Sequence, residues 1–382
     1  MLSARYGALA AARSLGRMGV AAYAIHDERA APALSSRYWK RTFLWDFSRP
    51  AEQSVAFVLD VGRRIGSSVL LMPTSDSLTI FVAQHAQALR ETFTFPSISV
   101  DLVKTLSNKR EMSILARSRG IPTPKAMFPL GDVNALLDEV LFPVMLKGMD
   151  PLKPGGKFNT LVLSRDDLLR RLTALGEGAS ANLLLQEYIP GGEESVWMFN
   201  GYFDRRGECL AAFTGRKIRQ WPPYHGVTSL GICAANPKID VLTRDFLGSL
   251  GYHGIVDVGY RYDTRDGQYK LLDVNPRLGA TFRLFVAPTG VDVVRAFYLD
   301  MTGQPVPETL LTEGRKWLLE EDFISFRQYL RDRRLTIWQW MQSLRGVRET
   351  AWFASDDPVP FLIWLVQRLG LAAKPVGMRT DG

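Results

Sequence analysis

The sequence contains little cysteine or histidine. Its 382 residues include two cysteines, Cys209 and Cys233, and four histidines that are scattered along the chain. No CxxC pair is present, so the sequence supports neither a zinc site nor a disulfide framework. Scarce, unpaired cysteines are typical of a reducing compartment, and we expect a cytoplasmic protein. A Ser–His or Cys–His pattern typical of nucleophilic catalysis is also absent.

Long apolar runs are missing too. No stretch reaches the roughly 18 uninterrupted apolar residues of a membrane span, and residues 1–16 lack the apolar core of a signal peptide. The apolar segment PVPFLIWLVQRLGLA is interrupted by Gln367 and Arg368. We interpret the Trp-rich residues 301–382 as helices that pack onto the core, with a partner-binding or membrane-surface module as the alternative.

The composition predicts a folded protein of two or three domains. Hydrophobic residues make up 46% of the sequence and charged residues 23%, so disorder is not expected. An excess of 47 Lys and Arg over 39 Asp and Glu gives a net charge of +8, which suits an anionic ligand such as a nucleotide. The arginines are scattered, so we expect no nucleic-acid partner. A homo-oligomer is neither indicated nor excluded.

Three common nucleotide-binding motifs are absent. The only P-loop candidate, PGGKF, has Phe158 where Ser or Thr is required and is preceded by Pro151 where the first Gly is required. The short motif GRMG follows a helical pattern rather than a strand, so it is no Rossmann fingerprint. The HRD and DFG motifs of protein kinases do not occur. A nucleotide site in this chain must therefore have another form.

The first part of the chain alternates between helical and strand patterns. Helices are expected at residues 8–18 and about 50–65, and strands at VAAYAI, TFLWDF and SVLLMPTSD. The last of these runs into a polar loop, where ligands bind in open α/β sheets. A doubly wound domain normally begins with a strand. Here the chain begins almost in a helix, so the first strand is either absent or lies upstream of Met1.

A second unit begins near Leu106. The segment NKREMSILARSRG predicts a helix that ends at Gly120, and FPVMLKG, LVLS and LLLQEYIP predict strands. Ser164 and Asp167 form a capping-box pattern before the next helix. The segments GIVDVGYRYD and YKLLDVNPRLG, joined by a DGQ turn, predict a β-hairpin.

The strand LLDVNPRLG places unlike groups on its two faces. A period of two puts Asp273, Asn275 and Arg277 on one face, and Leu272, Val274 and Pro276 on the other. A face that carries an acid, an amide and a cation is a candidate for chemistry, although it could simply face water.

The order of these segments resembles the ATP-grasp superfamily, and more closely its carboxylate–amine ligase branch, which includes D-aspartate ligase-like proteins. RSLGRMGVAAYAI, SNKREMSILARSRGIPTP, FPVMLKG, LLQEYIPGGEES, TGRKIRQWPP and DGQYKLLDVNPRLG carry the resemblance, which covers about residues 10–300. It implies an α/β and α+β fold in three parts. These are a Rossmann-like pre-ATP-grasp domain at residues 1–105, the ATP-grasp domain at 106–300 and a helical extension at 301–382.

The resemblance implies three lysines at the phosphates of ATP. Lys147 ends an apolar strand and Lys109 opens a helix, so two ammonium groups could clasp the phosphates as point charges. In the superfamily a loop such as KPGGKF closes over the triphosphate, with Lys157 as its anchor. The alternatives are ordinary surface lysines and a plain hairpin turn.

The segment QEYIPGGE resembles the link between the two halves of an ATP-grasp fold. The resemblance implies that Gln186, Glu187, Tyr188 and Ile189 surround the adenine. Glu193 corresponds to the acid that binds both ribose hydroxyls, since a carboxylate can accept two hydrogen bonds. If this segment is a strand, its neighbour Glu194 points the opposite way, as an ordinary surface acid.

Asp273 and Asn275 provide the oxygen ligands that Mg²⁺ prefers, and Mn²⁺ would also fit. The resemblance assigns Arg277 to the transferred phosphate or the substrate carboxylate. Arg216 and Lys217, with Arg219, are candidates for the acyl phosphate or substrate, and a solvated strand is the equal alternative.

One position departs from the family pattern. The first acidic metal ligand is expected at position 259, where this chain has Gly259. Asp257 lies two residues earlier, hence on the same strand face, and could take the role.

We therefore expect an ATP-dependent ligase that joins a small, amino-acid-like carboxylate to an amine. The carboxylate would be activated as an acyl phosphate, and the products would be an amide, ADP and phosphate. The alternative is a nucleotide-binding homologue without ligase activity, which Gly259 and the missing first strand favour.

Overall fold

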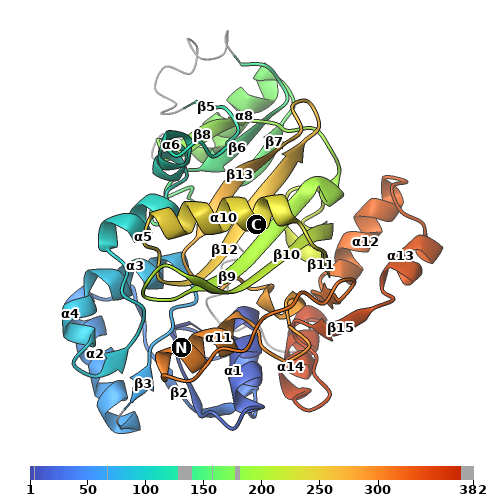
Figure 1. The fold of residues 1–382 in the computed structure, drawn as a ribbon. Helices are drawn as coiled ribbons and strands as arrows, with labels where there is room; N and C mark the ends of the chain where they lie inside the picture. Colours follow the sequence, from blue (N-terminus) through green and yellow to red (C-terminus); the bar gives the residue numbers. More distant parts are fainter. Residues whose placement is uncertain (4, 67, 128–139, 157, 177–180, 371–382) are drawn as a thin grey trace.

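The computed structural model describes residues 1–382 apart from 4, 67, 128–139, 157, 177–180 and 371–382. The described chain forms an N-terminal α/β domain, a small sheet and a large sheet. A C-terminal segment lies beside both the large sheet and the N-terminal domain (Figure 1).

The N-terminal domain has the predicted alternation of helices and strands. Its elements are α1 (Tyr6–Gly16), β1 (Ala22–His26), η1 (Pro32–Ser35), β2 (Trp39–Leu44), α2 (Ala51–Ile65), β3 (Val69–Leu70), α3 (Asp76–Gln84), α4 (Ala86–Leu89) and β4 (Phe93–Thr94). β1 pairs with β2 in parallel, and β3 pairs with β4 in parallel. Both helices expected from the sequence are confirmed, whereas SVLLMPTSD forms a strand of only two residues.

Leu2 lies between these two pairs of strands. It forms parallel bridges to Ile25 on one side and to Pro73 on the other, and its side chain is fully buried. Its backbone N–H donates to the carbonyl oxygen of Met72 at 3.0 Å. Leu2 therefore occupies the position between β1 and β3 where the sequence showed no strand.

The small sheet follows two helices that connect it to the N-terminal domain. The helices are α5 (Val100–Ser107) and α6 (Lys109–Ser118), and the next elements are β5 (Ala126–Met127), β6 (Val144–Gly148), β7 (Asn159–Val162), α8 (Arg165–Leu175) and β8 (Leu183–Glu187). The strand order is β5-β8-β6-β7, and all pairs are antiparallel. Ser164 caps α8 by accepting from the N–H of Asp167 at 3.2 Å. The Asp167 carboxylate accepts from Leu163 N instead of completing the expected capping box.

The large sheet has the strand order β13-β12-β9-β10-β11-β14-β15. The segment of the chain that forms its first five strands contains, in order, η2 (Glu193–Ser195), β9 (Val196–Phe203), β10 (Cys209–Trp221), β11 (Val227–Cys233), α10 (Pro237–Ser249), β12 (Gly254–Asp263), β13 (Gln268–Asn275), η3 (Phe282–Leu284) and α11 (Val293–Met301). The predicted hairpin of β12 and β13 is confirmed.

Both faces of the large sheet are covered, which explains why β9 is buried along nearly all of its length. On one face, Phe199 belongs to the same buried cluster as Phe246 of α10. On the other face, Tyr202 packs edge-on against Phe297 of α11, with ring centroids 5.9 Å apart. The polar residues of the central strands must therefore be explained by specific partners rather than by solvent.

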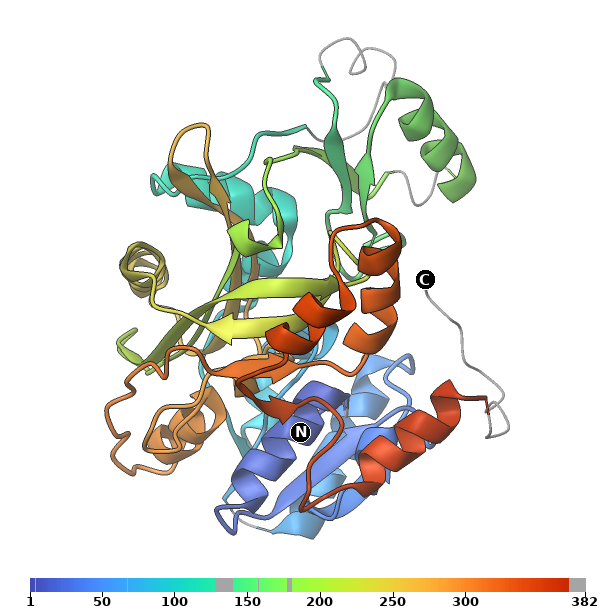
Figure 2. The ribbon, with the colours of Figure 1, turned by 90° about the vertical axis from the view of Figure 1, so that its right-hand side faces the viewer.

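The C-terminal segment adds two strands that the sequence analysis did not predict. It contains β14 (Lys316–Leu318), α12 (Asp322–Arg331), α13 (Ile337–Ser343), β15 (Val347–Thr350) and α14 (Val359–Arg368). β14 pairs antiparallel with β11, and β15 pairs in parallel with β14, so the segment extends the large sheet as well as supplying helices. Figure 2 shows α14 running beside the N-terminal domain. None of the described helices is long and apolar enough to cross a membrane.

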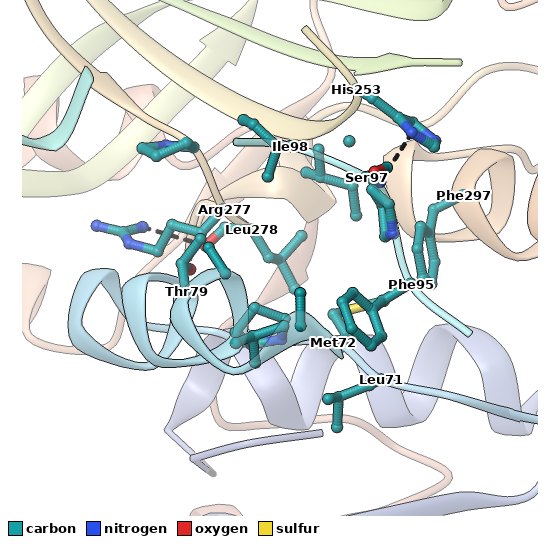
Figure 3. A pocket seen from close by; sticks show the side chains of 18 of the residues that line it. Leu71, Met72, Thr79, Phe95, Ser97, Ile98, His253, Arg277, Leu278 and Phe297 are labelled. Carbon is teal, nitrogen blue, oxygen red and sulfur yellow. Dashed lines mark hydrogen bonds between the residues drawn. The ribbon is translucent and has the colours of Figure 1, made fainter. Parts of the chain in front are cut away.

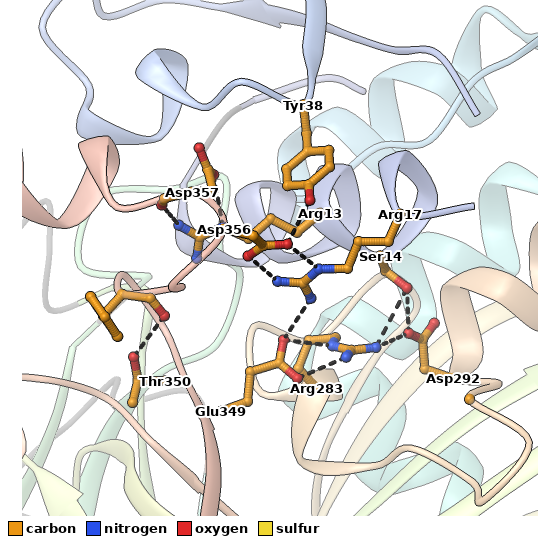
Figure 4. Close-up of polar contacts among 12 residues, drawn as sticks. Arg13, Ser14, Arg17, Tyr38, Arg283, Asp292, Glu349, Thr350, Asp356 and Asp357 are labelled. Carbon is orange, nitrogen blue, oxygen red and sulfur yellow. Dashed lines mark hydrogen bonds and ion pairs between the residues drawn. The ribbon is translucent and has the colours of Figure 1, made fainter. Parts of the chain in front are cut away.

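Arg13 of α1 and Arg17, directly after its end, tie the N-terminal domain to the C-terminal segment (Figure 4). Arg13 is 2% exposed, and its Nε donates to the buried carboxylate of Asp357 at 2.9 Å. Arg17 is more exposed and makes two hydrogen bonds of 2.9 Å to Asp356. The consecutive acids Asp356 and Asp357 thus pair with two arginines that lie one helical turn apart. The pair with Asp357 is buried, and the pair with Asp356 lies at the surface.

Candidate active site

The polar face of the β12–β13 hairpin forms the centre of the candidate site. Asp257 lies opposite Asn275, and Gly259 lies opposite Asp273. The Asn275 Nδ2 donates to the Asp273 carboxylate at 3.0 Å and to the carbonyl oxygen of Asp257 at 3.2 Å. The structure therefore brings together the three residues that the sequence analysis assigned to a metal.

A bulge changes the predicted faces of β13. The pairing shifts between Gly259 and Tyr260, so that Tyr260 lies opposite Leu271 and Leu272 is the extra residue. Leu271 is consequently buried in the core with Val274, whereas Leu272 is only partly buried. The prediction that Leu272 shares the buried face of Val274 is wrong, because strict period two ends at the bulge.

The Asp273 carboxylate lies over Gly259. A Cβ at position 259 would collide with Oδ1 of Asp273, so glycine leaves the space that this carboxylate occupies. Asp257 lies against Gly279 and accepts a hydrogen bond of 2.8 Å from Nδ2 of the buried Asn200. Burial raises the pKa of Asp257 to about 6, against the attraction of the nearby Arg277. Asp257 is thus a partly buried carboxylate whose pKa lies close to neutral pH. It is already hydrogen-bonded to Asn200, so it is not freely available to replace the acid missing at position 259.

Three lysines lie near Asp273, and Arg261 lies near two of them. We refer to these four cations as the cation cluster: Lys109, Lys147, Lys217 and Arg261. Lys147 in β6 is 9% exposed. Burial lowers its pKa to about 8, Asp273 acts in the opposite direction, and the three other cations lower the pKa further. Burial likewise lowers the pKa of Lys109 and of Lys217, and in both cases Asp273 is the main opposing charge.

The members of the cation cluster come from distant parts of the chain. Lys109 begins α6, and its N–H donates to the carbonyl oxygen of Met149 at 3.0 Å, beside the end of β6. Lys217 lies in β10 of the large sheet, and its Nζ donates to the carbonyl oxygen of Gly226 at 3.0 Å. The small and large sheets thus face each other across a concentration of positive charge, which attracts anions.

The sequence analysis missed Arg261. It lies in β12, four residues after Asp257, and its guanidinium lies 5.6 Å from the ring centroid of Tyr188. Its Nη2 donates to the carbonyl oxygen of Gly191 at 2.6 Å, while its buried Nε has no partner among the described residues. Period two from Asp257 through Gly259 would have placed it on the same face.

Arg277 is anchored by a residue that the sequence analysis did not single out. Its Nε donates to the Asp76 carboxylate at 2.6 Å, and its Nη2 donates to Oδ1 of Asn275 at 3.2 Å. Asp76 is the last residue of the SVLLMPTSD segment and the first residue of α3. The N-terminal domain therefore contributes to the candidate site.

The three cations of TGRKIRQ are separated by the structure. Lys217 joins the cation cluster, whereas the adjacent Arg216 lies on the opposite face of β10. Arg219 is 3% exposed and forms a buried ion pair with Asp322 of α12 at 2.7 Å. Arg219 therefore fixes the C-terminal segment to the sheet.

The residues expected around adenine connect the small sheet to the large sheet. Gln186 and Ile189 are buried, and the Tyr188 ring lies beside Arg261. Glu187 accepts from the N–H of Lys125 at 3.0 Å and pairs with Arg265 at 2.5 Å. Through the Tyr188 ring, this segment contacts the cation cluster.

Glu193 and Glu194 lie in a short 3-10 helix rather than in a strand, so the predicted reason for their opposite directions is wrong. Glu193 is partly buried and accepts a hydrogen bond of 2.7 Å from Tyr329 of α12. Glu194 is exposed, as expected for the surface acid of the pair.

The loop after β6 is folded tightly on itself. A Cβ at Gly156 would collide with the backbone of Asp150, so glycine is required for this approach. The Asn182 side chain holds the loop by donating to the carbonyl oxygens of Asp150 and Pro154 at 2.9 and 3.0 Å. Lys157, the predicted anchor in this loop, lies outside the described residues.

The donor set at the hairpin fits a hard divalent cation held jointly with a phosphate ligand. Within the described part of the chain, no three His, Cys, Asp or Glu side chains gather as a complete metal site. Asp273, Asn275 and Asp257 nevertheless offer carboxylate and amide oxygens on one face. Mg²⁺ commonly takes one or two protein carboxylates and completes its coordination with phosphate oxygens and water.

Comparison with known proteins relates the chain to ligases. No family model matches the sequence. D-aspartate ligase from Enterococcus faecium (strain Aus0004) is 27% identical over 240 residues, which is 59% of this chain and 57% of that enzyme. The chain thus matches little more than half the length of this curated relative.

Solved structures match over a larger share of the chain. An ADP complex of N5-carboxyaminoimidazole ribonucleotide synthetase has a TM-score of 0.65 at 14% identity, covering 86% of this chain and 84% of that chain. L-amino acid ligase from Bacillus licheniformis has a TM-score of 0.57 at 13% identity, covering 78% and 72%. At these identities the match concerns the fold alone.

Proposed function

The chain has the ATP-grasp fold and is a homologue of D-aspartate ligase, and from this premise we propose that it is an ATP-dependent carboxylate–amine ligase. The observation that carries the proposal is the cation cluster facing Asp273 and Asn275. Buried cations opposite two oxygen donors suit a magnesium–triphosphate complex, whose charge both sets of groups would share.

In the proposed reaction, an oxygen of the substrate carboxylate attacks the γ-phosphorus of ATP, and ADP leaves. The amine nitrogen then attacks the acyl carbon of the resulting acyl phosphate, loses a proton and expels phosphate. The product is an amide. No protein nucleophile is needed, and the chain's contribution is positioning and charge stabilisation.

The side chains have distinct parts in this reaction. Lys147 and Lys109 hold the phosphate oxygens, and Lys217 stabilises charge on the transferred phosphoryl group. Arg277, held by Asp76, orients the carboxylate that attacks. Asp273 and Asn275 would hold Mg²⁺, which when bound neutralises phosphate charge.

Arg261 and Glu193 would bind the nucleoside end. Arg261 lies beside Tyr188 in the segment expected near adenine, and Glu193 offers a carboxylate for the ribose hydroxyls. The relative and one structural neighbour are named as ligases of D-aspartate and L-amino acids, so amino-acid-like substrates are the first to test.

Hydroxylamine provides a direct test, because it can replace an unknown amine and convert an acyl phosphate into a stable hydroxamate. Purified protein, MgATP and hydroxylamine would be screened against amino acids of both configurations and small carboxylic acids. The proposal predicts ADP release and hydroxamate in equal amounts with at least one acid. ADP release without hydroxamate, or no bound nucleotide, would contradict it.

A second candidate is a nucleotide-binding protein without ligase activity. Gly259 in place of an acid, together with the engagement of Asp257 by Asn200, favours this alternative. It predicts tight MgATP binding with no ADP release under any combination of acid and amine.

A further inference from the structure

A cavity of about 110 Å³ lies between the N-terminal domain and the large sheet (Figure 3). One wall comes from the segments that follow β3 and β4, including Met72 and Phe95. The opposite wall comes from the beginning of β12 and from Leu278, and Phe297 of α11 closes one side. The cavity is predominantly apolar and lies at the carboxyl ends of β3 and β4, the usual position for a ligand in an α/β domain.

His253 lines this cavity and carries an unused polar group. Its side chain is 8% exposed, and its Nδ1 accepts a hydrogen bond of 3.0 Å from the backbone N–H of Ser97. Burial lowers the pKa of His253, so the ring is neutral and carries its proton on Nε2. Nε2 is buried and has no partner among the described residues. A buried donor without an acceptor is costly, and a ligand can supply that acceptor.

The cavity adjoins the candidate active site along the chain itself. Pro276, Arg277 and Leu278 all line it, and they directly follow Asn275. In Figure 3, Arg277 lies at one side of the cavity, and His253 and Phe297 lie at the other. A carboxylate held at Arg277 would therefore have an apolar space beside it for the rest of the molecule.

We propose that this cavity binds the apolar part of the carboxylate substrate, and that His253 Nε2 donates to one neutral acceptor on that part. The inference rests on the proposed ligase function. A cavity of about 150 Å³ can hold benzene, so about 110 Å³ suits a branched group of four or five non-hydrogen atoms. A second carboxylate in this space would lose its hydration. The further cation at the cavity, Arg90, is exposed and stacks over the Phe95 ring, so it compensates little and an aspartate-like side chain is disfavoured.

Three isosteric acids test the proposal directly: 4-oxopentanoate, 4-methylpentanoate and succinate. They share one carboxylate and two methylene groups, and differ in carrying a ketone, a hydrocarbon or a second carboxylate. Ligand-observed NMR titration of the full chain, with and without MgATP, should give 4-oxopentanoate the highest affinity. Succinate should bind at least tenfold more weakly. Succinate binding as tightly as either of the others, or no binding by any of the three, would overturn the subsite.

Two variants separate the subsite from the active site. Ala83→Leu places three more carbons in the cavity and should weaken 4-oxopentanoate binding at least tenfold. His253→Asn keeps an acceptor for Ser97 N but removes the donor at Nε2, so it should abolish the preference for 4-oxopentanoate over 4-methylpentanoate. Unchanged binding in Ala83→Leu, or a retained preference in His253→Asn, would contradict the proposal.

The affinity for MgATP shows whether a negative result concerns the proposed ligase function or only the proposed subsite. Both variants should bind MgATP as the unaltered chain does, which also shows that they are folded. If the chain binds no nucleotide but binds the acids in the expected order, the proposed function fails and the subsite stands. If it binds nucleotide and prefers succinate, only the subsite fails.

Discussion

The Tyr329 hydroxyl donates a hydrogen bond of 2.7 Å to Oε1 of Glu193, across 136 residues of sequence. The same hydroxyl lies 3.3 and 3.4 Å from the backbone nitrogens of Gln220 and Tyr224. Through Tyr329, α12 of the C-terminal segment fixes the orientation of a carboxylate proposed to bind ribose. The C-terminal segment therefore contributes to the proposed nucleotide site as well as to the large sheet.

Glu193→Gln should weaken ATP binding about tenfold, because a neutral amide replaces a charged double acceptor. It should also remove the preference for ATP over 2′-deoxy-ATP, measured by calorimetric titration. Tyr329→Phe should have a smaller effect on affinity and lower the free energy of unfolding by about 1–2 kcal/mol. The exposed neighbour provides the control: Glu194→Gln should change neither the affinity for ATP nor the preference for ATP over 2′-deoxy-ATP. A retained 2′-hydroxyl preference in Glu193→Gln would refute the ribose assignment.

ATP affinity should decrease above about pH 8. The pKa of Lys147 is about 8, and only its protonated form attracts phosphate. Deprotonation should weaken ATP binding about tenfold between pH 7 and 9, since one pKa unit corresponds to a tenfold change. Lys147→Arg should remove this dependence because arginine stays charged. Lys104→Arg, at an exposed position of α5, should leave the pH profile unchanged. A flat profile for the unaltered protein would show that Lys147 does not bind phosphate.

Asp273→Asn should abolish ADP release while the protein stays folded. The substitution removes the carboxylate that attracts the three lysines of the cation cluster and that is proposed to hold Mg²⁺. Asp266→Asn is the matched control, because Asp266 lies at the exposed turn of the same hairpin and pairs with Lys270. The measurements are steady-state ADP release and circular dichroism. Turnover in Asp273→Asn at the unaltered rate would exclude the metal assignment.

Asp257→Asn should become more stable, relative to the unaltered protein, as pH rises. Asp257 has a pKa of about 6 in the folded state and about 4 when unfolded, so the folded state binds more protons between these values. The unaltered protein therefore loses stability from about pH 4 to 6, whereas the variant does not undergo that loss. The relative gain should be about 2 kcal/mol at pH 7.5 compared with pH 4.5.

Denaturant unfolding at the two pH values measures this difference. Asp266→Asn again serves as the control, because Lys270 lowers the pKa of Asp266 and the relative change should have the opposite sign. A variant whose stability follows the same pH profile as the unaltered protein would mean that Asp257 ionises normally.

Arg13 and Arg17 should differ greatly in their contribution to stability. Arg13→Met leaves the buried Asp357 carboxylate without its cationic partner, which should cost about 3–5 kcal/mol. Arg17→Met removes a partly exposed pair with Asp356 and should cost less than about 1 kcal/mol. Urea unfolding of the two variants gives the comparison. Equal losses would mean that burial does not decide the strength of these pairs.

The local parts of the site were predictable from the sequence, because they depend on neighbours along the chain. The hairpin and the shared face of Asp273 and Asn275 follow from period two and a turn. Arg261 was predictable by the same rule and was overlooked. The bulge at Leu272 was not predictable, because it depends on the partner strand.

Contacts between distant segments had no signal in the sequence. Asp76 and Arg277 are 201 residues apart, and each alone is an ordinary charged residue. β14 has three residues, too few for a recognisable pattern, and it exists because β11 offers a free edge. Such features arise only when the folded chain brings the partners together.

The buried pair of Arg13 and Asp357 also has a consequence for synthesis. The two residues are 344 positions apart. At about 5–20 residues per second, a ribosome needs on the order of tens of seconds to add the second after the first. Throughout that time the Arg13 guanidinium has no carboxylate partner from the C-terminal segment. The nascent N-terminal domain must keep that charge hydrated, and its final packing can be completed only after Asp357 has been added to the chain.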